Sequence, residues 1–303
     1  MPELPEVETV ARNLRDGHPR EQADNMSQPE NSFKVREPRA EYVTPLPSAI
    51  SIVGKTITGA QVLWHRTLAE PDEQTFYDQI IGQQIEDVGR RAKYLILHLS
   101  KQKLIIHLRM SGDIMIVPID QALAPHDRLT LMLDGQYRLA FNDTRKFGRV
   151  WLVNDPAPLF ANLGPEPFSD EFTPEWLHTA LHTKNRQLKP LLLDQSFLAG
   201  LGNIYTDEAL HRARVHPLTP SGSVNESQAA RLWESIRQVL QDGIQHNGSS
   251  IDWVYRGGGF QNYFQVYDRA GEPCYTCGTL IARIVVGQRG TYFCPACQIS
   301  VEG

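Results

Sequence analysis

The sequence predicts an α+β fold with an N-terminal β-sandwich, a helical second part and a small metal-bound hairpin near the C-terminal end. Three observations predict it. Short apolar runs separated by polar breaks fill residues 54–153, as in antiparallel sandwiches. Helix-start signals and helical periodicity follow from residue 173. All four cysteines lie within the last thirty residues.

The opening segment predicts the first helix. Pro5 suits a first helical turn. Val7, Val10 and Leu14 then recur at helical spacing. Residues 20–49 are polar, contain four prolines and show no hydrophobic period, so we expect a long surface loop or a partly ordered insertion there.

The region from Gly54 to Val153 carries mainly β signals. Asp134 and Gly135 form a strong hairpin-turn signal between two apolar runs. The expected strands cover residues 94–99, 104–108, 113–117, 129–133 and 137–141. Residues 154–172 contain four prolines and are interpreted as a linker, which gives a first domain of residues 1–153.

Residues 173–260 are expected to form a helical domain. Thr173 is a candidate N-cap, followed by proline at the first helical position and an acidic residue in the first turn. One face of a later helix is marked by Leu232, Ile236, Val239 and Leu240. Three consecutive glycines, 257–259, then break the chain into a flexible loop, and residues 261–303 form the last unit.

The cysteine spacing indicates a metal site. Two residues separate Cys274 from Cys277, and two separate Cys294 from Cys297. Sixteen residues lie between the two pairs. Two such pairs complete a tetrahedral thiolate site for one structural Zn²⁺. Redox dithiols are the alternative. Between the pairs, Arg289 lies where a hairpin tip would present it to a phosphate, or simply to solvent.

The charge is distributed unevenly. The whole chain has a formal charge of −5, which disfavours a nucleic-acid partner when taken alone. Residues 1–87, however, contain 8 Lys and Arg against 15 Asp and Glu, whereas residues 88–150 contain 11 against 5. This asymmetry indicates a polyanion-binding face, with an ordinary solvated surface as the alternative.

The N-terminus offers unusual chemistry. Removal of Met1 before a small residue would leave Pro2 with a free secondary amine, which attacks an aldehyde carbon and forms an iminium ion directly. At a sugar C1′ this would release the base and then break the 3′ phosphate bond by elimination. Glu3 is placed to transfer protons. A frayed acidic terminus is the alternative, although the apolar residues of the first helix tether this end.

Several motifs together resemble bacterial formamidopyrimidine-DNA glycosylases. The motifs appear in the family's order along nearly the whole chain: MPELPEVET, RRAKYL at 90–95, HLRMSG at 107–112, RKFG at 145–148, GNIY at 202–205 and the terminal cysteine finger. The resemblance implies a helix–two-turns–helix in the second domain, a lesion-covering loop over 248–260, and a DNA glycosylase and AP lyase for oxidised purines in double-stranded DNA.

The resemblance also implies roles for individual residues. Pro2 would be the Schiff-base nucleophile and Glu3 the proton donor, Lys93 would assist β-elimination, and Arg289 would assist δ-elimination. The family's probes, which fill the gap left by a flipped nucleotide, match Met110, Arg145 and Phe147. The family's phosphate-binding positions match His126, Lys184, Lys189 and Asn203.

The chain departs from the family pattern at a few positions. Residues 20–49 are longer than the family leads us to expect, and Arg109 and Asp268 stand where glycine is common. Two rival functions remain. One is the sister branch that prefers oxidised pyrimidines, against which the probe set and the opening motif argue. The other is a non-catalytic zinc-finger DNA-binding protein, against which the presence of Pro2, Glu3 and Lys93 argues.

The remaining expectations concern location and assembly. No apolar run reaches the roughly 18 residues that a membrane span needs, and the acidic N-terminus lacks the apolar region of a secretory signal. We therefore expect a monomeric protein of the bacterial cytoplasm, bound to DNA and not to membranes.

Overall fold

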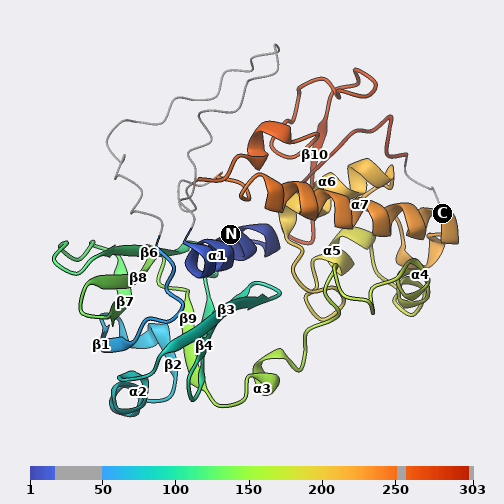
Figure 1. Cartoon of the computed structure of the whole chain (residues 1–303). Coiled ribbons are helices and arrows are strands. Elements are labelled where there is room, and N and C mark those ends of the chain that lie inside the picture. Colours follow the sequence, from blue (N-terminus) through green and yellow to red (C-terminus); the bar gives the residue numbers. More distant parts are fainter. Residues whose placement is uncertain (18–49, 251–256, 300–303) are drawn as a thin grey trace.

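The computed structural model describes residues 1–17, 50–250 and 257–299. The expected insertion at 20–49 and residues 251–256 of the expected lesion-covering loop lie outside the described residues. A β-rich half and a helical half stand side by side, and helix α1 (Leu4–Asp16) lies between them (Figure 1). Within the described residues, no helix is both long and apolar enough to cross a membrane.

The β-rich half is the predicted sandwich. Its first sheet has the order β1-β7-β8-β6, and its second has the order β2-β9-β5-β4-β3. The strands are β1 (Ile57–Val62), β2 (Leu68–Glu70), β3 (Ile85–Arg91), β4 (Tyr94–Leu99), β5 (Lys103–His107), β6 (Gly112–Pro118), β7 (Asp127–Leu133), β8 (Tyr137–Asp143) and β9 (Arg149–Val153). Neighbouring strands run antiparallel, except β2 and β9, which pair in parallel.

The structure adds elements that the sequence analysis did not separate. Strands β1, β2, β3 and β9 and helix α2 (Glu73–Ile80) lie within the region interpreted as mainly β. Only Phe76 and Ile80 of α2 are buried, so its apolar face is too sparse to show a helical period. The expected linker contains one short helix, α3 (Ala157–Phe160), which has no buried residue.

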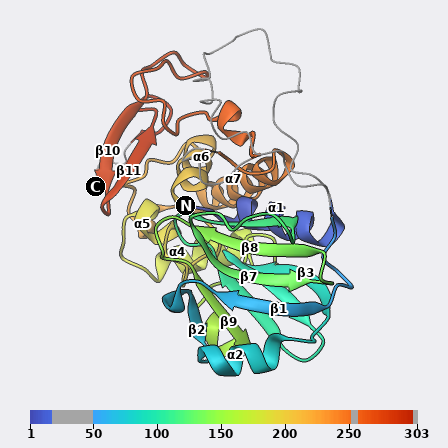
Figure 2. The same cartoon turned by 90° about the vertical axis from the view of Figure 1, so that its left-hand side faces the viewer.

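Over its described residues, the helical half contains four α-helices and the finger hairpin. These are α4 (Pro174–His182), α5 (Leu188–Leu192), α6 (Asn203–Ala213), α7 (Glu226–Gln245), β10 (Ala282–Val286) and β11 (Arg289–Phe293). The predicted N-cap is confirmed, because Thr173 Oγ1 accepts a hydrogen bond from Trp176 N at 3.1 Å. The hairpin lies beside α6, as Figure 2 shows.

Helix α1 belongs to two hydrophobic cores. Val7, Val10 and Leu14 pack into the sandwich core. Leu4 packs into the core of the helical half, and its N–H donates to Gly200 O at 3.1 Å. The first turn of α1 therefore lies where the two halves meet, and it carries the N-terminal residues to that boundary.

An ionic cluster fastens the linker to the sandwich. Arg90 donates to both carboxylate oxygens of Glu166, each at 2.9 Å, and to Glu8 of α1, also at 2.9 Å. Its side chain is only 8% exposed. Burial alone would raise the pKa of Glu8 and of Glu166. The Arg90 guanidinium stabilises both carboxylates in their charged form, so the pKa of each is lower than usual.

Replacing Arg90 by methionine should lower the free energy of unfolding by about 3 kcal/mol, because Glu8 and Glu166 would lose their most buried cationic partner and keep only the more exposed Arg12 and Arg91. Urea denaturation at neutral pH measures the change. Arg12→Ala is the matched control, since Arg12 also donates to Glu8 but is 48% exposed. We expect a change within about 0.5 kcal/mol there. Equal effects of the two substitutions would contradict a stabilising role specific to Arg90.

Candidate active site and DNA interface

A cleft between the two halves collects all four predicted catalytic residues. Its volume is about 230 Å³. The lining includes six residues that the sequence analysis singled out: Pro2, Glu3, Lys93, Met110, Asn203 and Arg289. These residues come from the chain start, β4's leading turn, the β5–β6 loop, α6 and the finger. The cleft therefore depends on both halves of the molecule.

Glu3 is held in the cleft through one of its two carboxylate oxygens. Its Oε1 accepts from Ile204 N, at the start of α6, at 3.0 Å. Its Oε2 is buried and has no hydrogen-bond partner among the described residues. Burial raises the pKa of Glu3, and the nearby Lys93 ammonium opposes that rise. A carboxyl group in this state can give a proton to a ligand in the cleft.

Lys93 is buried in the same cleft. Its Nζ donates to Leu201 O at 2.6 Å, and its side chain is 5% exposed. Burial lowers the pKa of Lys93, while the carboxylate of Glu3 acts in the opposite direction. An amine with a lowered pKa exchanges protons more readily near neutral pH than an exposed lysine does.

Glu6 is a residue of the site that the sequence analysis did not single out. Its Oε2 accepts from Glu3 N at 2.8 Å, and its Oε1 accepts from the hydroxyl of Tyr205 at 2.7 Å and from Ser249 N at 2.7 Å. Glu6 thus ties the chain start to α6 and to the segment after α7. The three-residue spacing of two acids at a helix start is the capping-box signal that could have identified it.

The finger turn is fixed by hydrogen bonds to the residue after Arg289. Gly290 O accepts from Asn203 Nδ2 and from Lys189 Nζ, each at 3.0 Å. The Lys189 ammonium also pairs with Asp207 at 2.7 Å, and both side chains are 0% exposed. Lys189 therefore lies beneath the finger turn in this structure, and its predicted contact with a phosphate stays a prediction.

The three predicted probes lie on two loops that are joined to each other. Met110 is in the β5–β6 loop, and Arg145 and Phe147 are in the β8–β9 loop. Ser111 Oγ donates to a carboxylate oxygen of Asp143, which also accepts from Arg145 N at 3.1 Å. The other oxygen of Asp143 accepts from Gly148 N at 2.7 Å. One buried carboxylate therefore sets the relative positions of both loops.

This edge carries exposed aromatic, cationic and imidazole side chains. Phe147 is 48% exposed, and the Arg145 guanidinium lies over its ring at 5.0 Å. His126 is exposed nearby, and its carbonyl accepts from Asp143 N at 2.9 Å. Arg109 and Asp268, at the two positions where the resemblance leads us to expect glycine, have positive φ angles of 56° and 57°. The backbone there retains a glycine-like turn without glycine.

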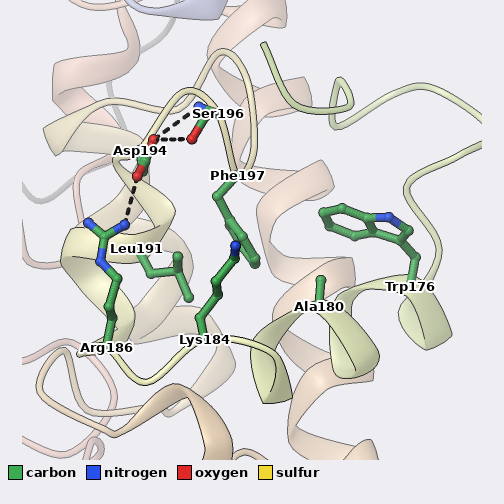
Figure 3. A pocket seen from close by; sticks show the side chains of 8 residues that line it. All are labelled: Trp176, Ala180, Lys184, Arg186, Leu191, Asp194, Ser196 and Phe197. Atoms are coloured by element: carbon green, nitrogen blue, oxygen red, sulfur yellow. Dashed lines mark hydrogen bonds and ion pairs between the residues drawn. The ribbon is translucent and has the colours of Figure 1, made fainter. Parts of the chain in front are cut away.

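Figure 3 shows a second cavity, of about 240 Å³, which shares no lining residue with the catalytic cleft. It is bounded by Trp176 of α4, Phe197 and the Arg186–Asp194 ion pair, whose N–O distance is 2.7 Å. Lys184 lines this cavity and is exposed. Lys184 is thus separate from the residues that the cleft brings together, and its phosphate contact stays a prediction.

The four cysteines converge as the spacing predicts. Their sulfur atoms all lie within 4.8 Å of one another, and none forms a disulfide. Tetrahedral thiolates around zinc would be separated by about 3.8 Å, given Zn–S distances of about 2.3 Å. The pairs Cys274–Cys297 and Cys277–Cys294 stand at 4.0 and 3.4 Å. The cluster fits one zinc ion with no open position, so the metal is structural.

These features define a class of protein. It is a zinc-finger protein in which amine and carboxylate groups line a cleft between a β-sandwich and a helical half. Family models agree with this division. Residues 48–150 match the formamidopyrimidine-DNA glycosylase N-terminal domain, residues 163–254 match its H2TH domain, and residues 271–299 match the zinc finger found in FPG and IleRS. The chain belongs to the formamidopyrimidine-DNA glycosylase family.

Individual relatives agree over the full length. Formamidopyrimidine-DNA glycosylase of Chloroflexus aurantiacus is 44% identical, with 100% of this chain and 99% of that protein covered. The protein of the same name from Protochlamydia amoebophila is 38% identical, with 98% and 99% covered. A crystal structure of the Lactococcus lactis glycosylase bound to AP-site DNA has a TM-score of 0.82 at 34% identity, covering 99% of this chain and 100% of that one.

Replacing Gly202 by alanine should destabilise the site. A Cβ atom at Gly202 would stand 2.2 Å from the carboxyl carbon of Glu3, so the buried carboxylate would have to move. We expect the free energy of unfolding to fall by about 1–3 kcal/mol, measured by urea denaturation. Gly222→Ala is the control, because a Cβ there meets nothing within 4 Å. A Gly202→Ala protein as stable as this control would contradict the described packing.

Proposed function

We propose that this chain is a bifunctional DNA glycosylase and AP lyase of base excision repair that removes oxidised purines, namely 8-oxoguanine and formamidopyrimidines. The observation that carries the proposal is the convergence of Pro2, Glu3 and Lys93 in one cleft beside the finger's Arg289. Solved relatives of 34% and 35% identity are described as bound to AP-site DNA and to DNA containing carbocyclic 8-oxo-G. Both ligands suit a site that acts on a damaged nucleotide.

The first chemical step uses the N-terminal amine. After removal of Met1, the Pro2 nitrogen attacks C1′ of the damaged nucleotide, the bond from C1′ to the base breaks, and the base leaves with a proton. Glu3 protonates the ring oxygen as the sugar opens, because its free Oε2 faces no other partner among the described residues. The product is a cationic iminium between Pro2 and C1′.

Elimination then cuts the strand. The iminium acidifies the proton on C2′, and its loss expels the 3′ phosphate. Lys93 is proposed to handle protons in this β-elimination, since burial lowers its pKa. Arg289 is proposed to hold the phosphate and to assist the later δ-elimination at C5′, with its turn held by Asn203 through Gly290 O. Hydrolysis of the remaining iminium ion, in which water adds to C1′ and the C1′–N bond breaks, frees Pro2.

The DNA interface is proposed to extend from the cleft along the probe loops. Met110 would fill the gap in the stack, Arg145 would bond to the orphaned base, and Phe147 would wedge the adjacent step. Backbone phosphates would be bound by His126, Lys184, Lys189 and Asn203. The two loops share the buried Asp143 carboxylate, which supports a single rigid insertion surface.

The alternatives are less well supported. A non-catalytic DNA-binding protein has no need for a buried amine beside an unpartnered carboxylate oxygen. The sister branch for oxidised pyrimidines shares the proline and the finger, but the curated relatives at 44% and 38% identity carry the formamidopyrimidine name. We further propose a monomer of the bacterial cytoplasm, divided into residues 1–153, a 154–172 linker, 173–260 and 261–303.

Borohydride should trap a covalent adduct on Pro2. A free α-amine titrates near about 7.7–8.0, and a secondary amine gives the iminium directly. Lys93 is the competing amine, and burial lowers its pKa. Its Nζ, however, donates a hydrogen bond to Leu201 O, which makes Lys93 the weaker candidate nucleophile. With 8-oxoguanine duplex, peptide mapping should place the cross-link on the N-terminal peptide, in wild type and in Lys93→Ala.

Protein that retains Met1 is the control for this trapping experiment, and it should form no adduct because its proline nitrogen is acylated. Intact-mass measurement establishes which form is present. A cross-link on Lys93 in the wild-type protein would overturn the assignment of the nucleophile.

Met110→Ala should impair excision of 8-oxoguanine more than binding of a duplex that already contains an abasic site. An abasic site has no base to extrude, so the unstacking that Met110 offsets is smaller. We expect the excision rate to fall about tenfold or more, corresponding to about 1.4 kcal/mol, with a smaller change in abasic-site affinity. Equal losses on both substrates would indicate that Met110 serves only packing.

A further inference from the structure

One face of α6 contacts the finger at successive turns. Asn203, Asp207 and His211 are spaced by four residues, so their side chains lie in one row along the helix. Asn203 donates to Gly290 O at 3.0 Å, and Asp207 accepts from Tyr292 N at 2.9 Å. The first two residues of the row therefore hold the hairpin, from its turn toward the metal end.

The third residue of the row reaches the metal site. His211 Nε2 lies 3.6 Å from Cys274 Sγ, and the two residues are 7% and 2% exposed. A zinc-bound cysteine is a thiolate, which can only accept a hydrogen bond. The imidazole must then be the tautomer that carries its proton on Nε2.

His211 is not a fifth ligand. The described metal-binding cluster contains the four cysteines, whose ligand atoms lie within 4.8 Å of one another, and His211 is not part of it. Four thiolates already complete the tetrahedral site. A hydrogen bond to one of those thiolates is the role that this position leaves for the imidazole.

We infer that His211 Nε2–H donates a hydrogen bond to the zinc-bound Cys274 thiolate and thereby sets how tightly this finger holds its metal. Such a bond draws charge from the sulfur, which makes the thiolate a weaker base and nucleophile, and it orients the sulfur toward the ion. Protonation or oxidation of Cys274, either of which releases zinc, becomes slower. The same bond joins the metal site to the helix whose first residue holds the Arg289 turn.

His216 provides a matched comparison. It is also 7% exposed and also packs on the finger, with its ring 4.6 Å from that of Phe293. Its Nδ1, however, accepts from Leu218 N at 3.2 Å, and no hydrogen bond joins His216 to a cysteine sulfur among the described residues. Loss of His216 removes a buried imidazole from the finger interface without touching a thiolate.

The experiment compares zinc-loaded full-length wild type with His211→Phe, His211→Gln and His216→Phe. Zinc release to excess chelator is followed with a chromophoric indicator, with and without hydrogen peroxide. Cobalt-substituted proteins report the thiolate-to-metal charge-transfer band. His211→Phe should weaken zinc retention by about 10- to 100-fold and shift that band, because the sulfur regains charge. Gln keeps an N–H donor near the same place, so His211→Gln should recover most of the retention.

His216→Phe should retain zinc as the wild type does, with an unchanged cobalt band. Wild-type retention and an unshifted band in His211→Phe would overturn the inference. Equal losses in the two phenylalanine variants would also overturn it, because packing and not the bond to sulfur would then be responsible. If His211→Phe does not fold, His211→Gln decides. A cobalt band unlike that of the wild type, together with zinc retention weakened by the same 10- to 100-fold, would contradict the role of the N–H donor.

Discussion

The site depends on the hydrogen bond between the Glu3 carboxylate and the N–H of Ile204. It joins the first turn of α1 to the first turn of α6, at a distance of 3.0 Å across the boundary of the two halves. Because Leu4 is buried in one core and Val7 in the other, α1 cannot shift toward either half without exposing apolar surface. Pro2 is therefore delivered to the cleft by packing on both sides.

This constraint explains why so many groups near the cleft are buried and ionisable. Glu3, Glu6 and Lys93 are all nearly inaccessible, and burial moves the pKa of Glu3 up and that of Lys93 down. Each change brings the group nearer to the neutral form needed for proton transfer around neutral pH. Glu3 stands at the start of α1 and Lys93 directly precedes β4, so packed elements bury both groups, whereas an exposed terminus would present them without that burial.

The sequence predicted the strand-rich first half, the first helix, the Thr173 cap and the zinc cluster, because each rests on local spacing. It did not separate α2, whose buried residues are Phe76 and Ile80 alone, or the strand β2, which is three residues long. The sequence did not identify Glu6 as a site residue because its partners, Tyr205 and Ser249, lie 199 and 243 residues away in the chain. Contacts at such separations leave no periodic signal.

The sequence by itself determined the chemistry that this protein can perform: an amine at Pro2, a carboxyl at Glu3, a lysine at position 93 and four thiolates with zinc spacing. Their identities and spacings are local properties that are read directly. Only the tertiary structure decided which of these groups share a cleft, that Lys189 lies paired with Asp207 under the finger turn, and that His211 reaches Cys274. Burial and the meeting of distant segments arise from packing, and packing is a property of the whole chain.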